Sequence, residues 1–97
     1  MTDLAEIAKA QYDWVESQGW HNKTPLEYLA LVASEVGEAI NECRGEIPTD
    51  RLGIELADIV LRTLDFAVVQ GIDIQEAIKV KMAINKVRGT RGRLRWK

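Results

Sequence analysis

The segment LGIELADIVLRTLDFAVV, residues 52–69, limits the possible folds of this 97-residue chain more than any other stretch. At about 100° per residue, its apolar side chains surround a helix almost completely, and such a helix is normally buried. Four charged residues nevertheless fall into one narrow sector of that helix, namely Glu55, Asp58, Arg62 and Asp65. The sequence therefore predicts a buried helix that holds acidic groups among apolar neighbours.

Helix signals recur along the rest of the chain and predict an all-α fold. The TPLE stretch at residues 24–27 combines an N-cap, a proline at the first helical position and a capping-box acid. Thr49 or Asp50 is expected to cap the apolar helix, and the DIQE stretch at residues 73–76 repeats the capping-box pattern. The four expected helices cover about residues 4–18, 25–44, 51–70 and 74–88, and no segment has the alternating pattern of a strand.

A chain of this length forms one domain with a modest core, so a second subunit would help to bury its apolar surface. We therefore expect a four-helix bundle that assembles as a homo-oligomer, with residues 1–88 as the domain and residues 89–97 as a basic tail. Residues 86–97 hold six basic residues and no acidic one, whereas all 15 acidic residues lie in the first 85. Such a tail could bind nucleic acid or polyphosphate, or it could only be solvated. A nucleic acid is not the partner that we expect.

The sequence contains no signal for a membrane or for export. It has no apolar run of about 18 residues free of charge, and its N-terminus lacks the basic and then apolar pattern of a signal peptide. We expect a cytoplasmic protein. One cysteine, Cys43, and one histidine, His21, are too few for a thiolate or histidine zinc site.

The acidic residues of the second and third helices form the main candidate site. A short loop joins these helices, so they should pack as an antiparallel pair and bring four acids together: Glu35, Glu38, Glu55 and Asp58. Carboxylates held close together repel one another unless a cation compensates them. That cation could come from a salt-bridge network with Arg44, Arg51 and Arg62, or from a divalent metal. Oxygen ligands of this kind suit Mg²⁺ or Mn²⁺.

The last helix offers groups that bind anions. Lys81, Asn85 and Arg88 lie at helical spacing on the stripe that Ile74 and Ile78 are expected to direct inward. Cationic and amide groups opposite carboxylates describe a site for a metal-bound phosphate ester. We prefer this interpretation to plain ion pairing.

Two motifs also carry a family resemblance. EVGE, residues 35–38, is followed after sixteen residues by ELAD, residues 55–58. This pair resembles the ExxE…ExxD signature of the MazG-like all-α nucleoside triphosphate pyrophosphohydrolases, and the K…N..R pattern of residues 81–88 also looks like that superfamily. The similarity covers roughly residues 25–88, and the short length is most similar to the single-domain proteins of phages and integrons. It implies Mg²⁺-dependent cleavage of a (deoxy)nucleoside triphosphate between the α and β phosphates, for nucleotide-pool housecleaning.

The resemblance further implies roles for individual residues. Four acids would bind the metal, namely Glu35, Glu38, Glu55 and Asp58. Three residues would hold phosphates, namely Lys81, Asn85 and Arg88. Many members of the superfamily have a further Glu directly before the first acid, whereas this sequence has Ser34. Either Glu35 or Glu38 could therefore be the catalytic base. It would deprotonate a water that the metal activates. The family also points to a dimer or a dimer of dimers.

Aromatic and amide groups follow the first helix. Trp14, Trp20 and Asn22 could stack on and read a nucleobase, which makes Trp20 a candidate substrate-binding residue. The alternative, which we prefer, is that Trp14 and Trp20 are packing anchors between helices. A lone metal-binding role for His21 is not expected.

Two other classes of protein are compatible with parts of this pattern. A di-iron carboxylate bundle also places acids inside helices, but its usual Glu-x-x-His pairs are missing here. A non-enzymatic helical oligomer that binds nucleotides or nucleic acid through its basic tail is the main alternative.

Overall fold

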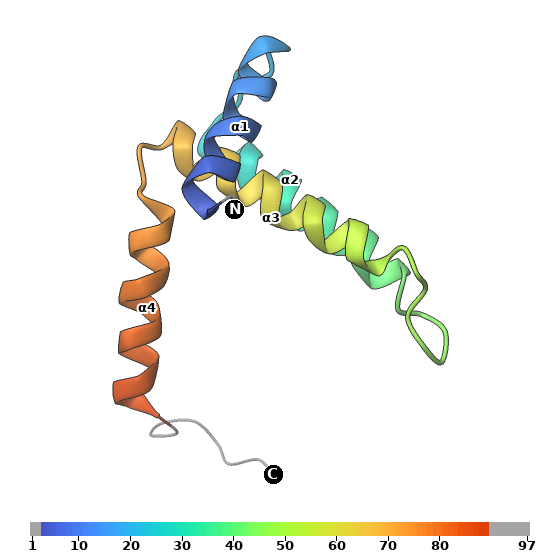
Figure 1. Ribbon diagram of the computed structural model, residues 1–97. Coiled ribbons are helices and arrows are strands. Elements are labelled where there is room, and N and C mark those ends of the chain that lie inside the picture. Colours follow the sequence, from blue (N-terminus) through green and yellow to red (C-terminus); the bar gives the residue numbers. More distant parts are fainter. Residues whose placement is uncertain (1–2, 90–97) are drawn as a thin grey trace.

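The computed structural model describes residues 3–89, and all of its regular structure is helical. Helix α1 covers Leu4–Ser17, α2 Pro25–Asn41, α3 Leu52–Val69 and α4 Ile74–Arg88 (Figure 1). No strand occurs between residues 3 and 89. The predicted all-α class with four helices is therefore confirmed. The basic tail from residue 90 onward lies outside the described residues, so its role stays a prediction.

The start of α2 is set by the predicted capping box. The Thr24 side chain accepts a hydrogen bond from the backbone N–H of Glu27, and the Glu27 side chain accepts one from the backbone N–H of Thr24. Two of the free donors at the helix end are thereby satisfied. At the start of α4, the Asp73 side chain accepts from the N–H of Glu76 as predicted.

The loop between α2 and α3 begins earlier than predicted. Helix α2 ends at Asn41 and not at Arg44, because Thr49 folds back onto Glu42. The Thr49 N–H donates to the Glu42 carbonyl at 2.9 Å, and its hydroxyl donates to the Glu42 carboxylate. The predicted cap position at Thr49 or Asp50 is wrong, since Arg51 directly precedes α3 and makes no side-chain capping bond. The Thr49 hydroxyl nevertheless accepts a hydrogen bond from the Arg51 N–H at 3.2 Å.

Helix α3 is the centre of the packed part of the chain. It lies antiparallel to α2 along much of its length, and α1 packs across it (Figure 1). Six residues form the buried apolar core: Ala8, Val15, Tyr28, Ala39, Leu64 and Ala67. The rings of Tyr28 and Phe66 stack with their centres 5.3 Å apart and join α2 to α3. This frame fixes α2 and α3 relative to each other, which is what positions the acidic residues.

Helix α4 departs from the predicted bundle. It touches α1 and α3 only near its start, where Ile74 and Gln75 are half-buried, and then extends away from the other helices (Figure 1). Gly71, with φ of 70°, turns the chain between α3 and α4. No residue of α4 is buried. The expectation that Ile78 points into a bundle within one chain is therefore wrong, since an apolar stripe does not specify which surface it packs on.

Apolar side chains are exposed on several helices of the single chain. On α2 the acidic face turns toward α3, so the opposite apolar face with Leu29, Val36 and Ile40 lies at the surface. On α3, Leu56 and Val60 are about half exposed. None of the four helices between residues 3 and 89 is both long enough and apolar enough to span a bilayer.

Candidate active site

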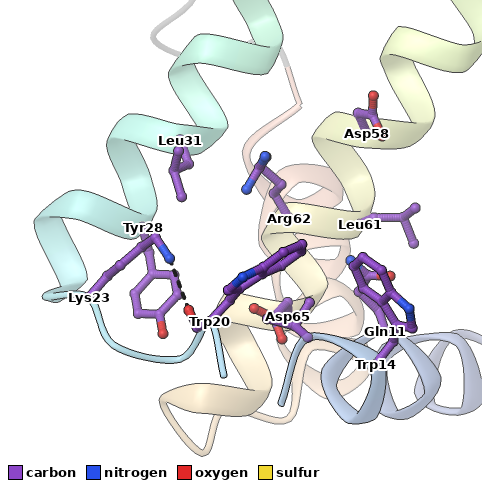
Figure 2. A pocket seen from close by; sticks show the side chains of 11 residues that line it. Gln11, Trp14, Trp20, Lys23, Tyr28, Leu31, Asp58, Leu61, Arg62 and Asp65 are labelled. Carbon is purple, nitrogen blue, oxygen red and sulfur yellow. Dashed lines mark hydrogen bonds between the residues drawn. The ribbon is translucent and has the colours of Figure 1, made fainter. Parts of the chain in front are cut away.

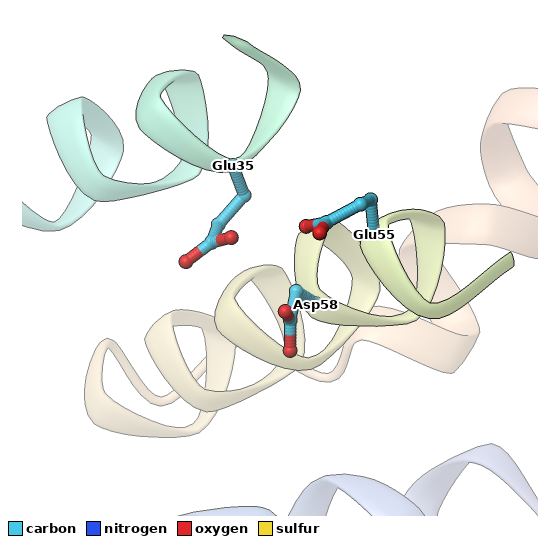
Figure 3. Close-up of side chains that lie close together, drawn as sticks. All are labelled: Glu35, Glu55 and Asp58. Carbon is cyan, nitrogen blue, oxygen red and sulfur yellow. The ribbon is translucent and has the colours of Figure 1, made fainter. Parts of the chain in front are cut away.

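Three acids from two helices meet at the contact between α2 and α3. Glu35 extends from α2 toward Glu55 and Asp58 on α3 (Figure 3), and carboxylate oxygens of the three lie within 4.8 Å of one another. Glu55 is only 7% exposed, whereas Glu35 and Asp58 are half-buried. Short-range repulsion between carboxylates is strong where water is partly excluded. The predicted meeting of the two acidic faces is confirmed for these three residues.

Glu38 lies outside this cluster. It is exposed one turn further along α2, on the same side as Glu35 but rotated away from the contact with α3. The residues of α2 that do face α3 include Tyr28, Glu35 and Ala39. Ser34, which stands where many family members have a further Glu, is also exposed.

Two arginines compensate part of the acidic charge. Nε of Arg62 lies 2.7 Å from Oε2 of Glu35, and Nη2 of Arg51 lies 3.6 Å from Oε2 of Glu55. Arg44 donates to the side chain of Asn41 at 2.9 Å and forms no ion pair with an acid of the described chain. The side chain of Asp58 has no ion-pair or hydrogen-bond partner within residues 3–89. The salt-bridge network that was one of the two alternatives is therefore present only in part.

The donor set fits a hard divalent cation. All three side chains offer carboxylate oxygens, which Mg²⁺ and Mn²⁺ prefer, and the three come close enough for small side-chain rotations to direct them at one ion. The incomplete arginine compensation leaves negative charge at Asp58. Together these features make the cluster a candidate metal site.

A cavity of about 260 Å³ lies next to the cluster, between α1, α2 and α3 (Figure 2). Asp58 belongs to both the cavity wall and the acidic cluster, so the two features are continuous. The remaining wall is formed by Gln11, Trp14, Val15, Trp20, Lys23, Tyr28, Leu31, Leu61, Arg62 and Asp65. An acidic cluster that opens onto a partly aromatic cavity can hold a ligand with an anionic end and a flat end.

The two tryptophans line this cavity and are not buried anchors. Their rings meet edge to face with centres 5.2 Å apart, and each side chain keeps about half of its surface exposed. The ammonium of Lys23 donates to the Trp20 carbonyl at 2.9 Å and lies over the Tyr28 ring at 5.9 Å from its centre. These contacts hold the loop after α1 against α2 and keep the Trp20 ring at the cavity (Figure 2).

His21 fastens the same loop to α1 and α3. Its Nδ1 lies 2.6 Å from Oε1 of Glu16, its Nε2 lies 2.7 Å from Oδ1 of Asp65, and its ring stacks on Tyr12. Burial alone would lower the pKa of His21, but the hydrogen bonds and charges of Glu16 and Asp65 together raise this pKa above the ordinary value of 6.5. His21 therefore has a structural partner on each nitrogen, in agreement with the prediction that it is not a lone metal ligand.

The three predicted phosphate-binding residues lie elsewhere. Lys81, Asn85 and Arg88 are exposed and line a shallow hollow at the end of α4, together with Gly89. Because α4 extends away from α2 and α3, the single chain does not bring these residues to the acidic cluster (Figure 1).

Comparison with known proteins decides the family. No model of a protein family matches the chain, and no solved structure does. A dATP/dGTP diphosphohydrolase of Cyanophage S-2L is 36% identical over 85 residues, which are 88% of this chain and 75% of that protein. The chain belongs to the MazG-like family. The resemblance inferred from EVGE and ELAD is thereby confirmed.

Several residues of this MazG-like cavity were missed at the level of sequence. Gln11, Lys23 and Tyr28 had no signal, because they come from different parts of the chain and meet only after α1 crosses α3. Asp65 did have a signal, since it shares a sector of α3 with Glu55 and Asp58. Its burial next to His21 could not be read from that spacing.

Proposed function

We propose that this MazG-like protein is a Mg²⁺-dependent nucleoside triphosphate pyrophosphohydrolase. It cleaves a (deoxy)nucleoside triphosphate between the α and β phosphates and releases the monophosphate and pyrophosphate, in cytoplasmic nucleotide-pool housecleaning. The observation that supports this most directly is the convergence of Glu35, Glu55 and Asp58 beside a cavity with aromatic walls. The Cyanophage S-2L relative is named a dATP/dGTP diphosphohydrolase, and this name supports nucleoside triphosphates as the substrate class.

The acids would hold the metal, with Mg²⁺ as the expected ion and Mn²⁺ as a substitute. Glu35, Glu55 and Asp58 are the ligands closest together, and Glu38 would join them from the next turn of α2. When bound, the ion would withdraw negative charge from phosphate oxygens and make water easier to deprotonate. Arg62, which pairs with Glu35 and lines the cavity, would stand beside the α phosphate.

Glu38 is the better of the two candidate bases. Glu35 already accepts a hydrogen bond from Arg62 at 2.7 Å and lies in the acidic cluster with Glu55 and Asp58. Glu38 has no ion-pair partner among residues 3–89 and is exposed, so it can take a proton from water and pass it to solvent. This assignment also removes the need for an acid at Ser34.

The cavity would hold the nucleoside. Trp20 offers an aromatic face next to Tyr28, and Asp58 marks the end of the cavity that opens onto the acids. A nucleotide bound in this orientation places its base among aromatic groups and its phosphates over the metal ligands. Binding of both ends fixes the bond to be cleaved relative to the base and the ion.

The phosphate-binding residues would come from a partner subunit. Lys81, Asn85 and Arg88 are exposed on a helix that leaves its own chain, and apolar residues on α2, α3 and α4 are uncovered. Exposed apolar surface of this extent marks an interface in soluble proteins. A homodimer, or a tetramer built as a dimer of dimers, would cover it and could bring α4 of one chain to the acids of another.

One assay tests this function. The protein is incubated with Mg²⁺ and each common NTP and dNTP, and pyrophosphate and orthophosphate are measured separately. Pyrophosphate with the matching monophosphate is expected, and Asp58→Asn should reduce the rate by about 100-fold or more because it removes a metal ligand. Glu76→Gln, an exposed acid on α4, serves as the matched control and should leave the rate unchanged. Orthophosphate with the nucleoside diphosphate would contradict the cleavage position.

A further inference from the structure

Asp65 is an ionisable group inside the cavity that the metal site does not use. It is only 5% exposed, and it lines the cavity together with Trp20 and Tyr28 (Figure 2). It lies seven residues beyond Asp58 on α3, which corresponds to about 10 Å along the helix. That separation is similar to the distance from the α phosphate to the far edge of the base in an extended nucleotide. Asp65 is therefore placed where the base would end.

His21 holds the Asp65 carboxylate in place. The His21 ring lies between two carboxylates, at 2.6 Å from Glu16 and 2.7 Å from Asp65. Burial opposes protonation of His21, but the hydrogen bonds and charges of Glu16 and Asp65 outweigh it and raise the pKa of His21. A protonated ring donates from both nitrogens, one to each carboxylate.

One oxygen of Asp65 is still available to a ligand. Oδ1 accepts the hydrogen bond from His21, and no hydrogen bond to Oδ2 occurs within residues 3–89. No fully enclosed polar side-chain atom in this part of the chain lacks a partner, so Oδ2 keeps some accessible surface, and Asp65 lines the cavity. A charged acceptor is thus presented to whatever fills the cavity.

The size of the cavity restricts what can reach this acceptor. About 260 Å³ is slightly below the range of pockets that hold drug-sized ligands, so it suits a base and not a whole nucleotide. A carboxylate pairs best with two adjacent N–H donors. Guanine presents such a pair on its Watson–Crick edge, its ring N1–H and its 2-amino group. Adenine and cytosine place an unprotonated ring nitrogen beside the amino group, and thymine and uracil place carbonyls beside their N–H.

We propose that Asp65 is a specificity-determining residue that selects guanine nucleotides by accepting hydrogen bonds from N1–H and the 2-amino group, one at Oδ2 and one at the second lone pair of Oδ1. The inference rests on the proposed function, because it places the base of the triphosphate in this cavity. Gln11 and Lys23 also line the cavity and could supply an amide or an ammonium donor for the guanine carbonyl. Trp20 stacks on the base, and His21 positions the Asp65 carboxylate.

The first experiment uses the unmodified protein and nucleoside monophosphates, so it does not depend on cleavage. Calorimetry compares dGMP with dIMP, which differs only by the missing 2-amino group, and with dAMP, dCMP and TMP. A lost hydrogen bond to a buried carboxylate should weaken dIMP relative to dGMP by about 10-fold to 100-fold. Equal affinities for dGMP and dIMP would overturn the inference.

The second experiment compares two variants. Asp65→Asn keeps the shape of the side chain but removes the charge and replaces one acceptor by a donor, so the preference for dGMP should fall by about 10-fold or more. Asp50→Asn is the matched control, because it makes the same change at an exposed residue that does not line the cavity. It should keep the preference. If Asp65→Asn does not fold, as judged by circular dichroism, the dIMP comparison decides alone.

The outcomes separate this inference from the proposed function. If the protein releases pyrophosphate from all triphosphates at equal rates and binds all monophosphates equally, the function stands and the role of Asp65 is refuted. If it binds dGMP preferentially but cleaves no triphosphate, the role of Asp65 stands and the function is refuted. A folded Asp65→Asn variant that keeps the full preference for dGMP also refutes the role of Asp65.

Discussion

Nε of Arg62 donates a hydrogen bond of 2.7 Å to Oε2 of Glu35 and thereby links the cavity wall on α3 to the acidic cluster on α2. The Glu35 side chain is mostly buried, whereas that of Arg62 is still 42% exposed. Solvent screening at Arg62 limits the contribution of the pair to about 0.5 kcal/mol. Such a weak ion pair can dissociate when a divalent cation binds the acidic cluster.

The melting temperature of the variant Arg62→Gln should therefore respond more strongly to Mg²⁺ than that of the unmodified protein. Without the guanidinium, repulsion among Glu35, Glu55 and Asp58 lowers the melting temperature in the absence of metal. A divalent ion that binds only the folded state then restores more stability. Thermal unfolding at increasing Mg²⁺ concentration should show a half-maximal response at a roughly twofold lower concentration.

Lys9→Gln is the control for this experiment. It removes the same charge from a fully exposed ion pair with Asp13, which lies on α1 outside the acidic cluster and the cavity. Its Mg²⁺ response should match that of the unmodified protein. If Arg62→Gln and Lys9→Gln behave alike, the acidic cluster is an ion-pair network and does not hold a metal.

The sequence was sufficient to predict the features that depend on short-range rules. The capping residues at Thr24 and Glu27 set the start of α2. The predicted pairing of α2 with α3 brought Glu35 to Glu55 and Asp58, although the connection, residues 42–51, is longer than expected. Capping and helical periodicity are local properties, so a single sequence carries them.

The features that depend on contacts between distant segments were not predictable. The contact between His21 and Asp65 spans 44 residues and exists only because α1 packs across α3. The predicted direction of α4 was wrong, because the apolar stripe of Ile74 and Ile78 indicates which residues are apolar but not which surface covers them. The tryptophans turned out to line a cavity, because the loop contacts of Lys23 hold Trp20 there.

The pH dependence of stability should reveal the protonated state of His21. The pKa of His21 is raised above 6.5 in the folded protein, so folding favours the protonated form. The stabilisation is fully present below about pH 6.5 and is lost as the pH rises through the folded pKa. Tyr28 will not contribute in this range, because burial and the Asp65 charge raise its pKa above 10.0.

Urea unfolding at several pH values from 6 upward can isolate this contribution. The free energy of unfolding of the unmodified protein should fall over this range, whereas His21→Gln should lack that part of the decrease. The test uses the difference between the two curves of unfolding free energy against pH, because the subtraction cancels the titration of other groups. A difference that does not change with pH would mean that His21 is neutral between Glu16 and Asp65.

Assembly can be tested at the exposed apolar surface of α3. Val60 is 49% exposed in the single chain, whereas Leu64, one turn further on, is only 3% exposed. Val60→Glu should therefore dissociate an oligomer and leave the chain folded, while Leu64→Glu should unfold the chain itself. Sedimentation at micromolar concentration and circular dichroism distinguish the two effects. An unmodified protein that sediments as a monomer with full activity would exclude the oligomer.

The strongest test of a shared site is to combine two inactive subunits. Asp58→Asn removes a metal ligand, and Lys81→Gln removes a cation from α4, so each variant alone should be nearly inactive. In a hetero-oligomer made by co-expression with two different tags, one site receives both defects and the other receives none if α4 comes from the partner. A purified heterodimer should then recover about half of the unmodified rate. If Lys81 instead serves the acids of its own chain, every site keeps one defect and no activity returns.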